Sequence, residues 1–259
     1  MATPREINRH MKSVGNIGKI TKAMKMVAAA RLRRAQEKAA ASRPYAIKIK
    51  EVLSNVVSDP SVLAGLDAKK HPLLQKREVQ KVGYLVLCSD KGLAGAYSSN
   101  ALKMAVAEIS ECEDEVVVIT CGRKARDFFT RRGFNVIQSH IGFSDRPTYE
   151  NAVDIAQDAI KTFANEGFDK LNIIYTVFKT ALSQVPTSEV ILPVEPPVKE
   201  EGKAQASFMF EPGEDDTLTV LAPKYLETVV YAALVQSAAS ELGSRMTAMS
   251  SATDNAAKL

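Results

Sequence analysis

Apolar residues recur every three or four positions along the first part of the chain. They are Ile7, Met11, Val14, Ile17, Ile20, Met24, Val27 and Leu32. This spacing places them along one face of an α-helix. The preceding Thr3-Pro4-Arg5-Glu6 is a capping-box sequence, in which the threonine caps the helix and the glutamate bonds back to the cap amide. The pattern predicts a helix over residues 4–43 that Pro44 ends or kinks, and a second helical stretch over residues 45–57.

The last part of the chain carries a second helical pattern, which is rich in small side chains. Its positions are Tyr225, Val229, Ala233, Ser237, Ala238, Leu242, Met246, Met249, Ala252 and Ala256. Small side chains allow a partner helix to approach closely. We expect Pro223 in the first turn of this helix, because proline fits the start of a helix better than its interior. The pattern continues to Leu259.

The expected lengths of these helices indicate how they are buried. At 1.5 Å per residue, a helix over residues 4–43 is roughly 60 Å long and one over residues 224–259 is roughly 54 Å long. Residues 82–209 would form a body only about 36 Å across. Neither helix can be buried along its whole length against such a body. The two helices are therefore predicted to pair as an antiparallel coiled coil that projects beyond it.

The middle of the chain alternates between strand and helix patterns. Strand-like runs cover Val82–Cys88, Val116–Thr120, Val136–Ser139 and Leu171–Phe178, and Glu189–Leu192 can add an edge strand. Helical patterns cover Ala101–Glu111, Arg123–Arg132 and Tyr149–Asn165. This alternation predicts a mostly parallel, Rossmann-like α/β domain. The expected division is a coiled-coil shaft over residues 1–57 and 212–259 and an α/β domain over residues 58–211.

Composition and charge narrow the class of protein. Hydrophobic residues make up 46% and charged residues 25%, which excludes wholesale disorder. No apolar run approaches the roughly 18 residues of a membrane-spanning helix. Residues 1–50 carry 13 lysines and arginines against two acids (+11), whereas residues 210–259 carry three against seven (−4). These opposite charges favour pairing of the two ends, or an external polyanion on the basic end.

No catalytic or metal-binding constellation is evident. Ser89–Asn100 follows a strand where many α/β folds bind nucleotides. It contains neither GxxxxGK followed by Ser or Thr nor GxGxxG, so tight packing is its favoured role. The three cysteines lack the spacing of a disulfide framework or zinc site, and Cys88 is predicted to be a buried structural thiol. The three histidines show no metal-ligand spacing. We expect no catalytic residue, cofactor or metal site.

A partner-binding surface is better supported. Basic residues that begin at Arg31 follow a methionine-rich patch around Met24, and this mixture suits a coiled coil or an adaptable protein surface. A nucleic acid is an alternative partner for so basic a helix, although residues 1–43 contain no aromatic residue to stack on bases. A basic coiled-coil scaffold and a phosphate-binding α/β enzyme are the remaining alternatives.

Three pairs of sequence blocks resemble the gamma subunit of F-type ATP synthase. They are Ile20–Ala29 with Ser42–Tyr45, Val82–Leu85 with Ser89–Gly95, and Ser240–Met249 with Ala252–Ala256. The blocks follow one another in the family's order over essentially the whole chain. The resemblance implies a rotor without an active site of its own, whose paired helices form the central shaft inside a hexamer of α and β subunits.

The resemblance also implies further partners and a location. The α/β body would be a foot on the membrane ring of c subunits, beside the epsilon subunit. Ion flow would turn ring and shaft, and the shaft would drive the β subunits through different nucleotide affinities to make ATP from ADP and phosphate. Only differential contact can shift a conformational equilibrium, so this needs a stiff, asymmetric lever. Since no leader precedes the fold, we expect a bacterial protein, peripheral on the cytoplasmic side of the cell membrane, with no nucleic-acid partner.

Seven residues match subunit-interface positions of this family. They are Met24, Arg31, Arg33, Arg34, Phe208, Glu241 and Arg245. Met24 matches the position that faces the acidic lever segment of the β subunit. Arg31, Arg33 and Arg34 continue the basic face beside it. Glu241 and Arg245 match a pair that supports contacts with the β subunit. The phenylalanine lies in Phe208–Pro212, which matches a foot region near the c ring. Packing between the two helices is the alternative role for Met24 and Met246.

The resemblance also concerns the end of the chain. Members of the family continue past the block Asp254-Asn255 for several helical turns, which include an Arg-Gln pair that grips the β subunit. This chain stops at Leu259. The resemblance therefore implies that the grip is missing, either by truncation or from incomplete coverage.

Overall fold

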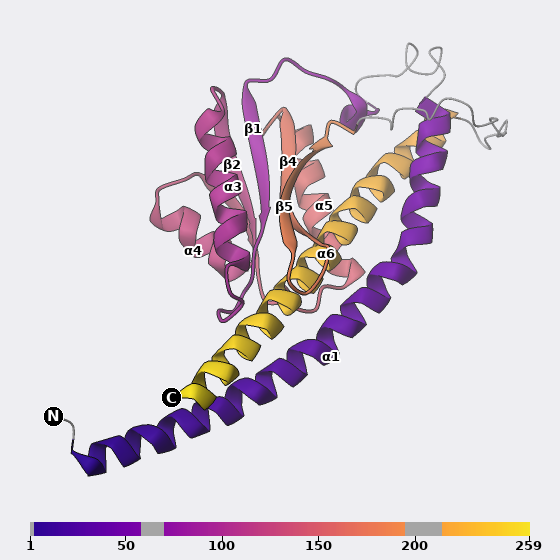
Figure 1. The fold of residues 1–259 in the computed structure, drawn as a ribbon. Helices are drawn as coiled ribbons and strands as arrows, with labels where there is room; N and C mark the ends of the chain where they lie inside the picture. Colours follow the sequence, from indigo (N-terminus) through magenta and orange to yellow (C-terminus); the bar gives the residue numbers. More distant parts are fainter. Residues whose placement is uncertain (1–2, 58–69, 195–213) are drawn as a thin grey trace.

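A pair of long helices and a five-stranded sheet make up the fold of the computed structural model, which describes residues 3–57, 70–194 and 214–259. The helices are α1 (Pro4–Val57) and α6 (Glu214–Lys258). They run in opposite directions, and the N-terminal end of α1 extends past the C-terminus of α6 (Figure 1). The predicted antiparallel helix pair is confirmed.

Helix α1 begins as the sequence predicts. The Thr3 amide donates to Glu6 Oε2 at 2.8 Å, and the Glu6 amide donates to Thr3 Oγ1 at 3.4 Å, which completes the capping box. Pro44 lies inside α1, so the two expected stretches form one helix. Figure 1 shows that this helix curves along the body. A proline removes one backbone hydrogen bond, and such a loss is compatible with a bent but continuous helix.

Helix α6 begins earlier than expected. Pro223 lies in its interior, because the helix starts at Glu214, so the prediction of a first-turn proline is wrong. Leu218, Ala222 and Leu226 around the proline are buried in the core. Their packing outweighs the single backbone hydrogen bond that the proline removes, and tertiary burial stabilises most protein helices more than intrinsic propensity does.

The sheet has the strand order β3-β2-β1-β4-β5. Its strands are β1 (Lys81–Leu87), β2 (Glu115–Cys121), β3 (Val136–His140), β4 (Lys170–Phe178) and β5 (Gln184–Leu192). The pairs among β1 to β4 are parallel, and β5 pairs antiparallel to β4 at an edge. The predicted mostly parallel α/β sheet is confirmed. The edge strand is longer than the expected Glu189–Leu192, and an edge position tolerates its internal Pro186.

Helices cover both faces of the sheet. The remaining ones are a short 3-10 turn (Pro72–Leu74), α3 (Tyr97–Glu111), α4 (Arg123–Arg131) and α5 (Tyr149–Ala164). On β1, Leu85 and Leu87 pack with α5 and α6, whereas Tyr84 and Val86 pack with α3 and α4. Burial on both faces explains why the strand patterns in the sequence are continuously apolar rather than alternating.

Helix α1 buries its apolar face only where α6 lies opposite. Thr21 Oγ1 and Thr253 Oγ1 are 2.8 Å apart, and Leu32 packs against Ala239 and Leu242. Towards the N-terminus, Ile7, Met11, Ile17 and Ile20 are at least 50% exposed. The prediction of one continuously buried face is therefore wrong. Ile7 and Met11 lie on the end of α1 that extends past α6, whereas Ile17 and Ile20 stay exposed although their neighbours Gly18 and Thr21 contact α6.

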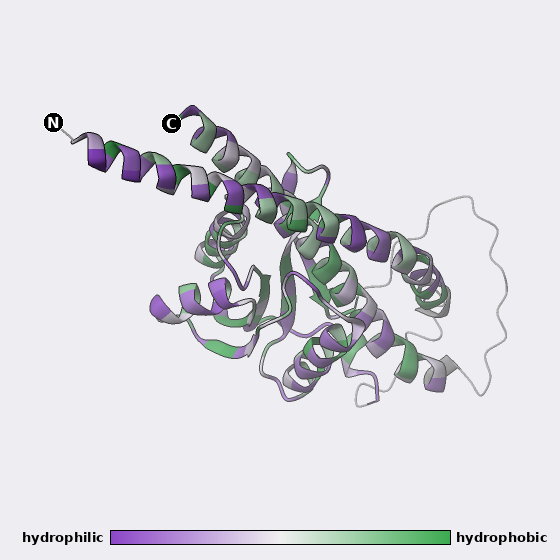
Figure 2. Ribbon diagram, turned by 90° about the horizontal axis from the view of Figure 1, so that it is seen from below, coloured by the Kyte–Doolittle hydropathy of each residue, from purple (hydrophilic) through white to green (hydrophobic). Residues whose placement is uncertain are grey.

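The contact between the two helices is neutral in character. Lys25 Nζ donates to Ser250 Oγ at 2.9 Å, next to the threonine pair. Among the residues described by the structure, no ion pair joins α1 to α6. Figure 2 shows hydrophilic residues spread along α1 and more hydrophobic ones along the packed helices and strands. Thus no ion pair between the described residues of the two helices accounts for the predicted attraction between the oppositely charged ends.

By length and hydropathy alone, α6 would be able to cross a membrane over Asp216–Lys258. Half of its most apolar window is buried inside the protein. One side of the helix packs on the sheet and α5, and the other packs on α1. Core helices pass the same test of length and composition. The apolar character of α6 is accounted for by this packing.

Candidate functional site

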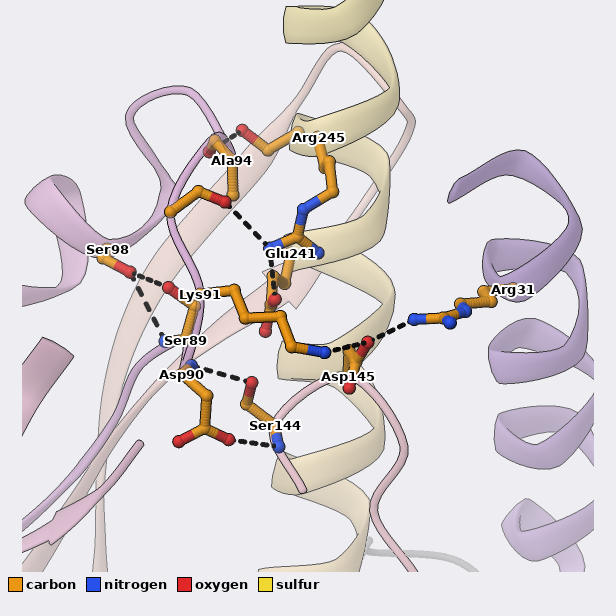
Figure 3. Close-up of polar contacts among 12 residues, drawn as sticks. Arg31, Ser89, Asp90, Lys91, Ala94, Ser98, Ser144, Asp145, Glu241 and Arg245 are labelled. Atoms are coloured by element: carbon orange, nitrogen blue, oxygen red, sulfur yellow. Dashed lines mark hydrogen bonds and ion pairs between the residues drawn. The ribbon is translucent and has the colours of Figure 1, made fainter. Parts of the chain in front are cut away.

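Three parts of the chain meet where β1 ends. The loop Ser89–Ala96 leaves β1, the loop 141–147 follows β3, and both lie against α6 close to α1 (Figure 3). Six of the seven residues matched to subunit interfaces lie on this part of α1 and α6, between Met24 and Arg34 and at Glu241 and Arg245. We call this region the junction.

Helix α6 holds the loop after β1 in place. Ser244 Oγ donates to the Ala94 carbonyl at 2.7 Å, and Arg245 Nη2 donates to the Gly92 carbonyl at 3.3 Å. Gly95 has a φ of +54°, and a Cβ there would lie 3.0 Å from Ser244 Oγ. The position therefore needs glycine both for its backbone conformation and for the close approach of α6. The expectation that this loop has a packing role is confirmed.

Glu241 and Arg245 form a buried ion pair one helical turn apart. Arg245 Nη2 donates to Glu241 Oε1 at 2.7 Å, and the two side chains are only 9% and 1% exposed, respectively. Burial raises the pKa of Glu241, and the charge and hydrogen bond of Arg245 oppose that shift. Among the described residues, Glu241 Oε2 has no hydrogen-bond partner. Both residues thus face the interior of this chain, and Arg245 also contacts the loop that carries Leu93.

Asp90 fixes the neighbouring loop 141–147. Its carboxylate accepts from the amides of Gly142 at 2.9 Å, Ser144 at 3.0 Å and Arg123 at 3.0 Å. The Asp90 amide donates to Ser144 Oγ at 2.9 Å. Burial alone would raise the pKa of Asp90, but these backbone hydrogen bonds hold the pKa below its usual value. Asp90 is therefore ionised and joins three segments at the end of the sheet.

Asp145, the next residue of that loop, contacts α1. Its Oδ2 accepts from Arg31 Nη1 at 2.5 Å and lies 3.6 Å from Lys91 Nζ. Arg31 therefore pairs with the body of this chain, although its sequence position was matched to a face beside the β subunit. Neither Asp90 nor Asp145 was predicted. Asp90 had a weak signal, since it directly follows a buried strand, whereas nothing in the sequence pairs Asp145 with Arg31.

The other matched basic residues of α1 are exposed. Arg33 Nε donates to Glu37 Oε1 at 3.1 Å on the helix surface. Arg34 lines a small pocket of about 190 Å³ with Lys38 and Arg146. In the described structure, Arg34, Lys38 and Arg146 have no ion-pair partner. Apart from Arg31, which pairs with Asp145, the basic face predicted from the sequence thus consists of exposed charges.

An apolar groove lies beside these charges. It measures about 540 Å³ and is lined by Met24, Ile20 and Val27 of α1 and by Leu93 of the loop after β1. Leu93 is 63% exposed and Val27 is 51% exposed. Met24 itself is half-buried, whereas Met246 packs in the cluster around Leu32. Phe208 lies outside the described residues.

The cysteine of the junction is not a reactive surface group. Cys88 at the end of β1 is buried, and burial raises the pKa of its thiol to about 12. At that value the thiol is not a nucleophile near neutral pH. In the described parts of the chain, no group of three or more histidine, cysteine, aspartate or glutamate side chains is placed to hold a metal ion. What the junction offers is a rigid surface with an apolar groove and exposed cations.

Comparisons with known proteins agree over the whole chain. A family model described as ATP synthase matches residues 3–259. The ATP synthase gamma chain of Brevibacillus brevis is 46% identical over 255 residues, which cover 97% of this chain and 86% of that protein. The gamma chain of Desulfitobacterium hafniense is 42% identical, covering 99% and 88%. Among solved structures, a central stalk chain of Tetrahymena thermophila mitochondrial ATP synthase has the same fold, with a TM-score of 0.67, 24% identity and coverage of 90% of this chain and 99% of that one.

Proposed function

The chain belongs to the ATP synthase gamma-chain family, and on this basis we propose that it is the rotor subunit of the enzyme's central stalk. In this role it couples ion-driven rotation of the membrane c ring to conformational changes of the catalytic β subunits, which make ATP from ADP and phosphate. The structural observation that carries the proposal is the long antiparallel helix pair fixed to an α/β body (Figure 1).

The geometry suits a rotating lever. Helix α6 is buried between the sheet and α1, so the body cannot turn without turning this helix. Helix α1 packs along α6 and curves, so the pair presents a different surface in each direction. A ligand or partner shifts a conformational equilibrium only by contacting its states differently. A stiff and asymmetric shaft meets that requirement for three surrounding catalytic subunits.

We propose that the apolar groove and the exposed cations of the junction meet the acidic lever segment of the β subunit. Met24 and Leu93 would supply the apolar contact, and Arg33 and Arg34 the charge. Exposed apolar patches rimmed by polar residues are typical of protein interfaces. Charge complementarity would orient the encounter with an acidic segment. In this arrangement Glu241 and Arg245 support the contact indirectly, because Arg245 donates a hydrogen bond to the carbonyl of Gly92, next to Leu93.

The remaining partners are the α subunits, the epsilon subunit and the c ring. We propose that the shaft, over residues 1–57 and 212–259, lies within the ring of α and β subunits, and that the α/β foot, over residues 58–211, meets the epsilon subunit and the c ring. Phe208 would belong to the foot surface near the c ring. The relatives named above are bacterial, which supports a peripheral location on the cytoplasmic side of a bacterial cell membrane. We propose protons as the transported ion.

We also propose that this chain is a non-catalytic subunit. The loop after β1, where other α/β proteins bind nucleotides, is held against α6 by Ser244 and Arg245. Nucleotide chemistry would then reside in its partners. A phosphate-binding enzyme and a nucleic-acid-binding scaffold are not favoured, because neither explains the similarity to gamma chains over the whole chain.

Assembly with the α and β subunits tests the proposal. The chain, carrying the full C-terminus of its gene, is co-expressed with both subunits from the same organism and purified through a tag on the β subunit. We expect one complex that contains all three proteins and hydrolyses MgATP, while the purified chain alone hydrolyses none. The α and β subunits expressed without the chain are the control. A chain that stays out of the complex, or that hydrolyses ATP or binds DNA by itself, would contradict the proposal.

A further inference from the structure

Asp145 links the N-terminal helix to the body through a residue that does not belong to α6. Its partner Arg31 belongs to α1, and its second cation, Lys91, belongs to the loop after β1 (Figure 3). The neighbouring polar contacts of α1 are different, since Thr21 and Lys25 both bond to α6. Among the helices and strands, α1 packs chiefly on α6. Arg31 therefore gives α1 a direct attachment to the α/β body.

The backbone next to Asp145 is held before Arg31 binds. Ser144 is bonded to Asp90 twice, through its amide and through its hydroxyl. Asp90 in turn bonds to Gly142 on the same loop and to Arg123 at the start of α4. Because the loop is already ordered, closing the contact with Arg31 costs little further conformational entropy.

The surroundings of this ion pair distinguish it from the surface pairs of α1. The side chain of Asp145 is 11% exposed and that of Arg31 is 30% exposed, whereas Arg33 and Glu37 are 83% and 62% exposed. Exposed pairs contribute little because water and salt screen them. A largely shielded pair between two structural units interacts more strongly. Lys48 provides the control, since it carries the same charge on the same helix and its pair with Glu51 is 63% and 48% exposed.

We propose that Asp145 is a positioning residue that fixes α1 to the body through Arg31, so that the foot and both shaft helices turn as one unit. This inference rests on the proposed rotor function. Helix α6 is held by its burial against the sheet, but without Asp145 the twist between α1 and the body would be resisted mainly through α6. A second attachment, made to a loop of the body rather than to α6, stiffens the shaft against this twist.

The test uses the complete ATP synthase in inverted membrane vesicles, with Arg31→Met, Asp145→Asn, the double variant, Arg31→Lys and Lys48→Met in this chain. Assembly, ATP hydrolysis and ATP-driven proton pumping are measured on the same vesicles. We expect Arg31→Met and Asp145→Asn to assemble and to lose about two-fold or more in protons pumped per ATP hydrolysed, a size typical of residues that couple distant sites. The double variant should be no worse than the poorer single one, and Arg31→Lys and Lys48→Met should remain close to wild type.

Several results would overturn the inference. They are wild-type pumping in Arg31→Met and Asp145→Asn, an equal loss in Lys48→Met, or losses that simply add in the double variant. If Asp145→Asn does not assemble, the comparison of Arg31→Lys with Arg31→Met decides, and equal pumping in these two overturns the inference. Failure of the wild-type chain to join the enzyme is a separate result, which would overturn the proposed function and this inference with it.

Discussion

Arg245 donates one hydrogen bond to Glu241 at 2.7 Å and another to the carbonyl of Gly92 at 3.3 Å. A single buried guanidinium thus compensates a carboxylate inside α6 and also holds the loop that carries the exposed Leu93. The family resemblance places this Glu-Arg pair at an interface, yet the pair faces inward. Its contribution to a partner is therefore indirect, through the position of the loop.

Replacing Arg245 by methionine should strongly destabilise the chain. The substitution leaves Glu241 buried without a counter-charge, and breaking such a pair costs about 3–5 kcal/mol. Urea denaturation followed by circular dichroism measures the change in free energy of unfolding. Burial already raises the pKa of Glu241 above its unfolded value of 4.5, and loss of Arg245 raises it further. The native state of the variant then favours the protonated carboxyl, so its deficit should shrink as the pH falls towards that value.

The double variant Arg245→Met with Glu241→Leu is the control for this prediction. It removes both charges and fills the site with apolar side chains, so it should recover much of the stability lost in the single variant. If the single variant is as stable as wild type, the buried pair is not the structural centre of the junction.

Gly122 should not tolerate alanine. Its φ is +97°, and a Cβ there would lie 2.2 Å from the carbonyl oxygen of Cys88, which belongs to the backbone at the end of β1. We expect Gly122→Ala to lower the free energy of unfolding by about 3 kcal/mol or more, because backbone strain and a backbone clash combine. Thermal unfolding measures the loss.

Gly133→Ala is the matched control. Gly133 has a φ of +76°, but nothing lies within 4 Å of its Cβ position. This variant should lose only the roughly 1–2 kcal/mol of left-handed backbone strain. Equal losses of stability in both variants would show that the close approach of Gly122 to β1 does not contribute to the loss.

The apolar groove should respond to a negative charge without loss of folding. Leu93 is 63% exposed and has a φ of +62°, a conformation that aspartate tolerates better than leucine. Leu93→Asp should leave stability unchanged within about 0.5 kcal/mol. It should lower the affinity for the assembly of α and β subunits roughly ten-fold, as expected for loss of a central apolar contact. A fluorescence titration with labelled chain measures this affinity.

Leu182→Asp is the control for the groove, because Leu182 is 84% exposed on the turn between β4 and β5 and does not line the groove. Its affinity should match that of the wild type. If the two variants bind alike, the groove is not the contact surface.

Asp90 should contribute a pH-dependent part of the stability. Its native pKa is held below the ordinary value of 3.8, so its stabilising effect is complete well above that pH and disappears as the pH falls through the native pKa. Asp90→Asn should cost roughly 1–2 kcal/mol at pH 7, allowing for solvent screening of a partly exposed group. The gap between variant and wild type should close below about pH 3.8. The midpoints of urea unfolding, measured for both proteins from pH 7 to pH 3, follow this difference in stability.

A carboxylate on the surface provides the comparison for Asp90. Asp127→Asn also removes an acid with a lowered pKa, but its side chain is 35% exposed beside Arg126, where solvent screens the charges. Its replacement should change the pH profile of stability less than Asp90→Asn does. A parallel profile for Asp90→Asn and wild type down to pH 3 would contradict the assigned role of Asp90.

Much of the fold could be predicted because local patterns decide it. The capping box of Thr3 and Glu6 starts α1 where expected, and the continuous apolar run of β1 corresponds to a strand buried on both faces. The start of α6 could not be predicted in this way. Pro223 argues for a helix terminus by itself, and only the packing of residues on either side of it on the sheet reverses that preference.

The sequence by itself determined the two terminal helices, the alternating α/β order and the family, since all three depend on the order and spacing of residues. The tertiary structure alone decided that Arg31 pairs with Asp145, 114 positions away, that Arg245 turns inward, and that the first turns of α1 leave their apolar face exposed. The physical reason is that pairing of charges and burial of side chains depend on distances between segments. Those distances are set only when the sheet, the loops after β1 and β3, and the two long helices come together.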